Sequence, residues 1–147
     1  MSAFTTEELA YLSSQRLGRL ATAARGEPHV VPVAFRYNAE HDTIDIGGHA
    51  FAGRKKFRDV QSNARVAFVV DDLASVQPWR PRGVEIRGEA EILNTGGKGI
   101  IASFDDEMFR IRPSRIYSWG LVEGAQGAGR EVSRSHRARQ PGHQGSA

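Results

Sequence analysis

Residues 42–72 have the sequence DTIDIGGHAFAGRKKFRDVQSNARVAFVVDD, which decides the fold more clearly than any other part of the chain. Alternating isoleucines predict a strand over 43–47, and the apolar run VAFVV predicts a strand over 66–70 that is buried on both faces. Between them, a glycine-rich turn leads into a short helix predicted over 53–63. The segment therefore predicts a strand, a turn, a basic helix and a second strand in succession.

The turn and the first part of this helix have the composition of a phosphate site. The residues concerned are Gly47, Gly48, Gly53, Arg54, Lys55, Lys56 and Arg58. Glycines let the backbone approach a ligand closely, and a helix N-terminus adds a partial positive charge to the fixed cations. A solvated basic helix face has the same composition, so spacing alone leaves both interpretations open.

The rest of the chain predicts one small, mainly β domain. Alternation and turn signals predict further strands over 17–23, 30–37, 84–93 and 108–119, the last interrupted at Pro113, and a short helix over 5–14. Six short strands with two helices fit a barrel capped by helices. We expect residues 1–120 to form this domain and residues 121–147, rich in Gly, Arg and Ser, to be disordered.

Composition limits the classes of function. The 147 residues include no cysteine, which excludes disulfides and favours a reducing, cytoplasmic location. The N-terminus carries acids rather than an apolar run, and no stretch approaches about 18 apolar residues, so we expect neither a signal peptide nor a membrane span. The net charge is +3, of which +2 comes from four Arg and two Glu in residues 121–147. A near-neutral body argues against a dedicated nucleic-acid-binding protein.

Two further segments offer candidates for a ligand site. In VVPVAF, the backbone of Pro32 and Val33 could line a planar heterocycle, or the segment could be a core strand whose proline marks an edge or a bulge. In PWRPRG, Trp79 stands between two prolines. It could cover a flat ligand, contact a partner subunit or pack on its own core.

The remaining charged clusters do not form a catalytic motif. Arg110, Arg112 and Arg115 could bind phosphate or carboxylate, or could form a solvated strand face. The acidic residues at 71–72 and 105–107 are interpreted as solvated turn charges. The five histidines lack metal-ligand spacing, so no metal site is expected. Any catalysis would therefore depend on a cofactor that carries the reactive atom.

The order of the motifs resembles a known family. The motifs VPVAF, IDIGG, GRKKFRDVQSNARVAFVVDD and VEIRGEAEIL resemble the flavin-binding split β-barrel of the pyridoxamine 5′-phosphate oxidase-like proteins. Two more, PWRPRGVEIRG and FRIRPSRIYSWG, are similar to the branch of coenzyme F420-dependent oxidoreductases of actinobacteria. The resemblance covers residues 5–120.

This resemblance implies a six-stranded antiparallel split β-barrel, the FMN-binding split barrel, that forms a homodimer with two cofactor sites at the interface. In the family, a basic pair after the third strand holds the cofactor phosphate, and Lys55 and Lys56 occupy that position. The backbone at Pro32 and Val33 would face the cofactor ring, and the two tryptophans would lie at the mouth of the site or come from the partner. The implied cofactor-binding residues are Pro32, Val33, Gly47, Gly48, Arg54, Lys55, Lys56, Trp79 and Trp119.

The resemblance also implies an activity. We expect an oxidoreductase that uses coenzyme F420 to transfer a hydride to an electron-poor double bond of a small molecule such as an enone, a quinone or a biliverdin-like tetrapyrrole. An FMN-binding protein of the same fold is the first alternative, and a non-enzymatic module that carries a cofactor or tetrapyrrole is the second. Pyridoxamine phosphate oxidation itself is not expected, because the C-terminal Arg-containing substrate motif of that enzyme is missing. No side chain stands out as a proton donor.

Overall fold

The structure is a computed structural model that describes residues 1–133. Its elements are α1 (Thr6–Ser14), β1 (Leu17–Ala24), β2 (Glu27–Asn38), β3 (Thr43–Ile46), the 3-10 turn η1 (Phe51–Gly53), α2 (Lys55–Ser62), β4 (Arg65–Ser75), β5 (Arg80–Leu93), the 3-10 turn η2 (Gly97–Gly99), β6 (Met108–Trp119) and β7 (Ala128–Glu131). Both predicted helices and all six predicted strands are present. Strands β2, β4 and β5 extend beyond their predicted limits.

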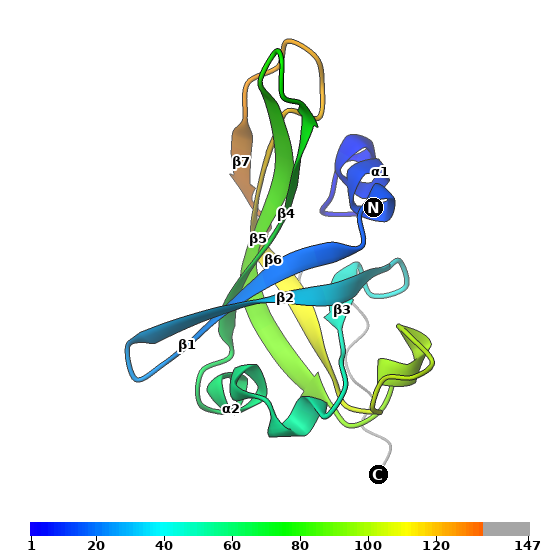
Figure 1. Ribbon diagram of the computed structural model, residues 1–147, viewed down its shortest axis with the longest axis vertical. Helices are drawn as coiled ribbons and strands as arrows, with labels where there is room; N and C mark the ends of the chain where they lie inside the picture. The colour runs from blue at the N-terminus through cyan, green and yellow to red at the C-terminus, as the bar shows by residue number, and fades with distance from the viewer. Residues whose placement is uncertain (134–147) are drawn as a thin grey trace.

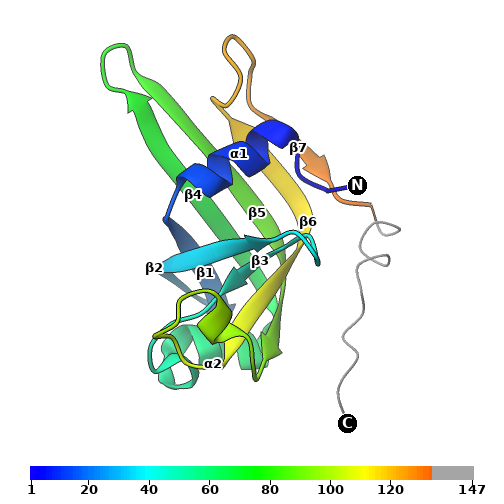
Figure 2. The same ribbon diagram turned by 90° about the vertical axis from the view of Figure 1, so that its right-hand side faces the viewer.

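Six antiparallel strands close into a barrel. Their order is β3-β2-β1-β4-β5-β6, and β6 pairs back onto β3. Figures 1 and 2 show α2 at one end of this barrel, with α1 lying across the upper parts of β4 and β5. The predicted mainly β, six-stranded antiparallel barrel is therefore confirmed.

Strand β6 closes the barrel because it is long enough to pair with three neighbours. Its first half, at Phe109–Ile111, pairs with β3, and its second half, at Arg115–Ser118, pairs with β7. Against β5, the register shifts between Arg87 and Gly88, opposite Pro113. The predicted interruption at Pro113 is thus a shift of register within a continuous strand, because the bulge accommodates a residue that cannot donate to the ladder.

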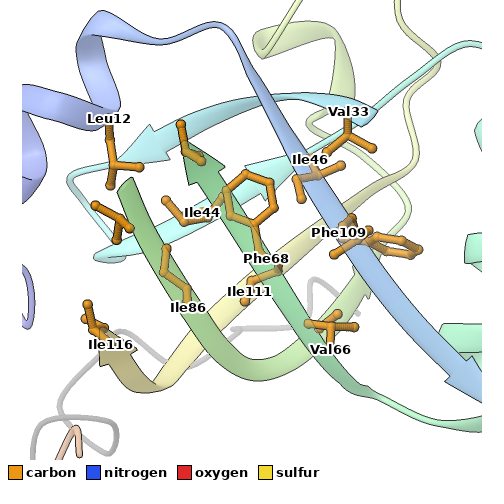
Figure 3. Close-up of a cluster of buried hydrophobic side chains, with 14 of the residues drawn as sticks. Leu12, Val33, Ile44, Ile46, Val66, Phe68, Ile86, Phe109, Ile111 and Ile116 are labelled. Atoms are coloured by element: carbon orange, nitrogen blue, oxygen red, sulfur yellow. The ribbon is translucent and has the colours of Figure 1, made fainter. Parts of the chain in front are cut away.

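The core fills the inside of the barrel with alternating side chains (Figure 3). On β4, the side chains of Val66, Phe68 and Val70 are buried, whereas Ala67 and Val69 between them are half-buried. The prediction that this strand is buried on both faces was therefore wrong. An antiparallel barrel strand packs one face on the core and leaves the other to the outside.

The chain continues in regular structure past the predicted domain boundary at residue 120. Strand β7 pairs with β6, and Val132, which follows it, is buried in the core. The prediction that disorder begins at residue 121 is corrected for the part of the tail that the structure describes. The prediction from composition missed this strand, because a strand that pairs with the free edge of another strand needs few apolar side chains. The predicted disorder of residues 134–147 lies outside the described residues.

Helix α1 is fixed to the barrel by polar contacts. Thr5 and Glu8 form a capping box at its N-terminus. The carboxylate of Glu8 is buried and accepts hydrogen bonds at 2.5 and 3.0 Å from Arg130 of β7. Burial opposes ionisation of Glu8, but the hydrogen bonds from Arg130 and from the Thr5 N–H outweigh it, so its pKa lies below the ordinary value. The Tyr11 hydroxyl donates to Asp72 at 2.8 Å.

Replacing Arg130 by methionine should destabilise the fold in a pH-dependent way. The change leaves the buried Glu8 carboxylate without its main partner, which should cost about 2 kcal/mol near neutral pH. Because the folded pKa of Glu8 is lowered, the stabilisation exists above its unfolded pKa and is lost as the pH falls through the folded value. Urea unfolding of both proteins at neutral and acidic pH checks this.

The control for this experiment is Arg115→Met. Arg115 pairs with Glu131 across the same two strands, but both side chains are exposed. Its removal should change the free energy of unfolding by less than about 1 kcal/mol at either pH. A cost of Arg130→Met that stays constant into acid would contradict the role of the Glu8 charge.

Candidate functional site

A hollow of about 470 Å³ opens between β2, the turn after β3 and the start of α2. Its lining residues are His29, Val31, Pro32, Val33, Ala34, Gly47, Gly48, His49, Arg54, Lys55, Lys56 and Phe104. One wall is the apolar strand β2, and the opposite wall carries the basic side chains. The hollow therefore offers a flat apolar surface beside a positively charged end.

The apolar wall is an unpaired strand edge. Strand β2 pairs with β1 along its first half, and its pairing with β3 begins only at Phe35. Residues 31–34 line the hollow within the half that has no second neighbour. Pro32 lies in this half, which confirms the predicted edge position, because proline has no N–H to offer a further strand.

The glycine turn is held in place from the loop that connects β5 and β6. The N–H of Asp105 donates to the carbonyl of Gly48 at 3.0 Å, and its carboxylate accepts from the N–H of Phe51 at 3.1 Å. At Gly47, an added Cβ would lie 3.0 Å from the ring of Phe104. Asp105 is thus not the solvated turn charge that the sequence suggested. It fixes the turn that leads into α2.

Lys55 is already paired within the protein. Its Nζ lies 3.0 Å from the buried carboxylate of Asp59, one turn later on α2, and Thr22 of β1 donates to the same carboxylate at 2.8 Å. The hydrogen bonds from Lys55 and Thr22 lower the pKa of Asp59. The positive charge of Lys55 is largely matched, which makes it a weaker phosphate ligand than the sequence suggested.

Lys56, by contrast, makes no ion pair within residues 1–133. Its Nζ lies 5.3 Å from the centre of the Phe51 ring, and the side chain is half-buried. Burial, and then the charge of neighbouring Arg54, lower the pKa of Lys56. Arg54 is exposed and donates to the carbonyl of His49 at 3.2 Å. Two cations that no carboxylate of residues 1–133 neutralises thus lie at the start of α2, where a bound anion would stabilise both.

The structure brings seven of the nine predicted site residues together in this hollow: Pro32, Val33, Gly47, Gly48, Arg54, Lys55 and Lys56. It does not bring the two tryptophans there. Trp79 lies in the turn between β4 and β5 with 66% of its surface exposed, and Trp119 ends β6 opposite Gly83. Figure 1 shows these strand ends far from α2. A contribution of either tryptophan to a partner's site stays a prediction.

The third basic cluster is not a ligand site. Arg110 is buried and pairs with Asp45 at 3.2 Å, while Arg112 pairs with Glu91 and Arg115 with Glu131. The interpretation as a solvated face was wrong for the buried Arg110, whereas the side chain of Arg115 is exposed. The sequence could not identify their partners, which come from other strands.

Sequence reasoning missed five residues of the hollow: His29, Val31, Ala34, His49 and Phe104. His29, Val31 and Ala34 flank the predicted residues Pro32 and Val33. The signal that could have found them is the edge position of β2, which Pro32 indicates. Phe104 reaches the site only through the tertiary fold. Residues 1–133 contain no group of three or more His, Asp or Glu able to hold a metal ion, and none of their helices is long and apolar enough to cross a membrane.

Comparisons with known proteins agree with this architecture. The family described as pyridoxamine 5′-phosphate oxidase matches residues 4–135. The chain is 49% identical over 119 residues to the 5a,11a-dehydrotetracycline/5a,11a-dehydrooxytetracycline reductase of Streptomyces rimosus, a match that covers 80% of this chain and 84% of that relative.

Two solved structures are similar in fold. A conserved hypothetical protein from Mycobacterium tuberculosis has a TM-score of 0.63 at 20% identity, over 82% of this chain and 87% of that one. An FAD binding protein from Mycobacterium smegmatis has a TM-score of 0.60 at 20% identity, over 90% of this chain and 100% of that one. At this level of identity, the likeness shows the fold alone.

Proposed function

Because the chain belongs to the pyridoxamine 5′-phosphate oxidase family, we propose that it is an oxidoreductase that uses coenzyme F420 to reduce an electron-poor double bond of a small organic molecule. The observation that carries the proposal is the hollow beside β2, where the unmatched cations Arg54 and Lys56 adjoin an apolar strand edge. A flavin-type cofactor has the same two parts, a planar ring and a phosphate.

The residues of the hollow fit such a cofactor. Residues 31–34 lie on a free edge, so the backbone N–H and C=O groups that point away from β1 can bind the polar rim of a planar ring, although Pro32 has no N–H to offer. Lys56 and Arg54 can hold the phosphate where α2 begins, because the side chain of the N-cap residue Arg54 makes no capping hydrogen bond with the N–H groups of the first turn. When bound, the reduced cofactor supplies the hydride, while the protein orients the ring and excludes water.

The relatives support the reductive direction and a substrate class. The relative from Streptomyces rimosus is named as a reductase of dehydrotetracyclines, which favours a conjugated enone among the substrates considered. Quinones and biliverdin-like tetrapyrroles share the electron-poor double bond and belong to the same proposal. FMN is the alternative cofactor, because the cations of the hollow suit its phosphate equally well and the family description names an oxidase.

We further propose a homodimer with one cofactor site per chain at the interface. Leu17 and Val30, on adjacent strands at the β1–β2 hairpin, expose 56% and 64% of their surfaces. Trp79 projects from the β4–β5 turn and fits a contact with a partner rather than with its own hollow. Covering these side chains would remove apolar surface from water.

A titration of the purified protein with coenzyme F420 and with FMN tests the proposal. We expect saturable binding at one cofactor per chain, tighter for coenzyme F420, and sedimentation as a dimer. Oxidation of reduced coenzyme F420 by an added enone should follow. Binding of neither cofactor would overturn the proposal, and tight binding without turnover over enones, quinones and biliverdin would favour a carrier module instead.

A further inference from the structure

His29 lies in the hollow without a hydrogen-bond partner. It belongs to β2 and faces Thr22 of β1 in the strand register. Its imidazole lines the hollow, while its Nδ1 atom is buried and has no hydrogen-bond partner in the structure. The residue is half-buried, so part of its ring is accessible from the hollow. A buried polar atom without a partner is uncommon in folded proteins and calls for an explanation.

The neighbours of His29 place it at the charged end of the hollow. Thr22, its partner in the register, donates to Asp59, and the charge of His29 itself acts on that carboxylate. Lys55, on the same helix, binds Asp59 from the other side. His29 therefore lies beside the start of α2, where the cations of the hollow gather.

The charged groups around His29 come from α2 and from the turn after β3. From α2, Asp59 and Lys55 largely cancel each other, while Lys56 and neighbouring Arg54 add positive charge. His49, on the turn after β3, lines the same hollow. A phosphate bound at this end of the hollow would therefore meet two cations and the imidazole of His29.

We propose that His29 binds the phosphate of the cofactor by donating a hydrogen bond from its imidazole to a phosphate oxygen. This inference rests on the proposed function, because it takes the phosphate of a flavin-type cofactor as the ligand. It adds an imidazole donor from β2 to a site whose other phosphate ligands, Arg54 and Lys56, come from the start of α2.

The test compares ligands that differ by the phosphate. Wild type and His29→Gln are titrated calorimetrically with FMN against riboflavin, and with coenzyme F420 against its phosphate-free deazariboflavin core. We expect His29→Gln to weaken binding of the phosphorylated ligands about 10- to 100-fold and to leave the phosphate-free ligands nearly unchanged.

Two matched variants complete the experiment. His41→Gln makes the same chemical change at a histidine whose Nδ1 is also buried without a hydrogen-bond partner but which does not line the hollow. His49→Gln removes the other histidine of the hollow. Both should lose less affinity for the phosphorylated ligands than His29→Gln does. On the wild-type protein alone, NMR should show the His29 imidazole responding to inorganic phosphate.

The outcomes separate this inference from the proposed function. Wild-type affinity of His29→Gln for the phosphorylated ligands would overturn the inference and leave the proposed function intact. An equal loss for phosphorylated and phosphate-free ligands would also overturn it, since it would indicate packing against the ring. Binding of neither cofactor to the wild type would overturn both.

Discussion

Lys56→Ala is expected to raise the Kd for coenzyme F420 and for FMN about 10- to 100-fold, because a hydrogen bond to a charged group contributes roughly 1.5–3 kcal/mol. The free energy of unfolding should hardly change. Lys56 makes no ion pair within the described residues, and burial already disfavours its charge. Calorimetric titration and urea unfolding of the same samples measure both quantities.

Lys55→Ala is the matched control, one residue earlier on α2. Lys55 is paired with Asp59, so its removal should lower cofactor affinity less than the loss of Lys56. It should instead destabilise the fold, because the buried carboxylate of Asp59 keeps only the hydrogen bond from Thr22. A larger loss of affinity in Lys55→Ala than in Lys56→Ala would contradict this division of roles.

Asp45→Ala is expected to cost about 3–5 kcal/mol in the free energy of unfolding, because it leaves a buried charge without its partner. Asp45 is completely buried where β3 and β6 close the barrel, and it accepts from Arg110 at 3.2 Å. Asn38 and Thr43 donate to the same carboxylate at 2.9 and 3.0 Å. The variant loses these contacts at the seam of the barrel, together with the ion pair to Arg36 at 3.5 Å.

Asp71→Ala provides the comparison for this prediction. Asp71 pairs with Arg19 at 2.7 Å, but both side chains are about half exposed, so the pair should contribute less than about 1 kcal/mol. Guanidinium unfolding of the two variants beside the wild type makes the measurement. Costs of similar size would show that the Asp45–Arg110 pair does not stabilise the seam.

Local patterns predicted the parts of this fold that depend on local physics. The capping residue Thr5 and the acids after it marked the start of α1, and alternation over 84–93 marked the buried face of β5. The glycines before a basic helix marked the charged end of the hollow. In each case the residues that signal the element also stabilise it.

What the sequence did not reveal depends on contacts between distant segments. Nothing near Arg110 indicates that Asp45 neutralises it, and nothing near Lys55 distinguishes it from Lys56 until Thr22 and Asp59 are placed beside it. Strand β7 escaped prediction because its stability comes from the edge of β6 and from Arg130 binding Glu8, not from its own composition.

The most direct test of the central claim is a crystal structure of the protein with coenzyme F420 or FMN bound. The account predicts the cofactor ring along residues 31–34 of β2 and the phosphate at the start of α2, within hydrogen-bond distance of Lys56. A cofactor bound elsewhere would contradict it, for example in the groove of about 450 Å³ that includes Asn63, Arg65 and Ser114.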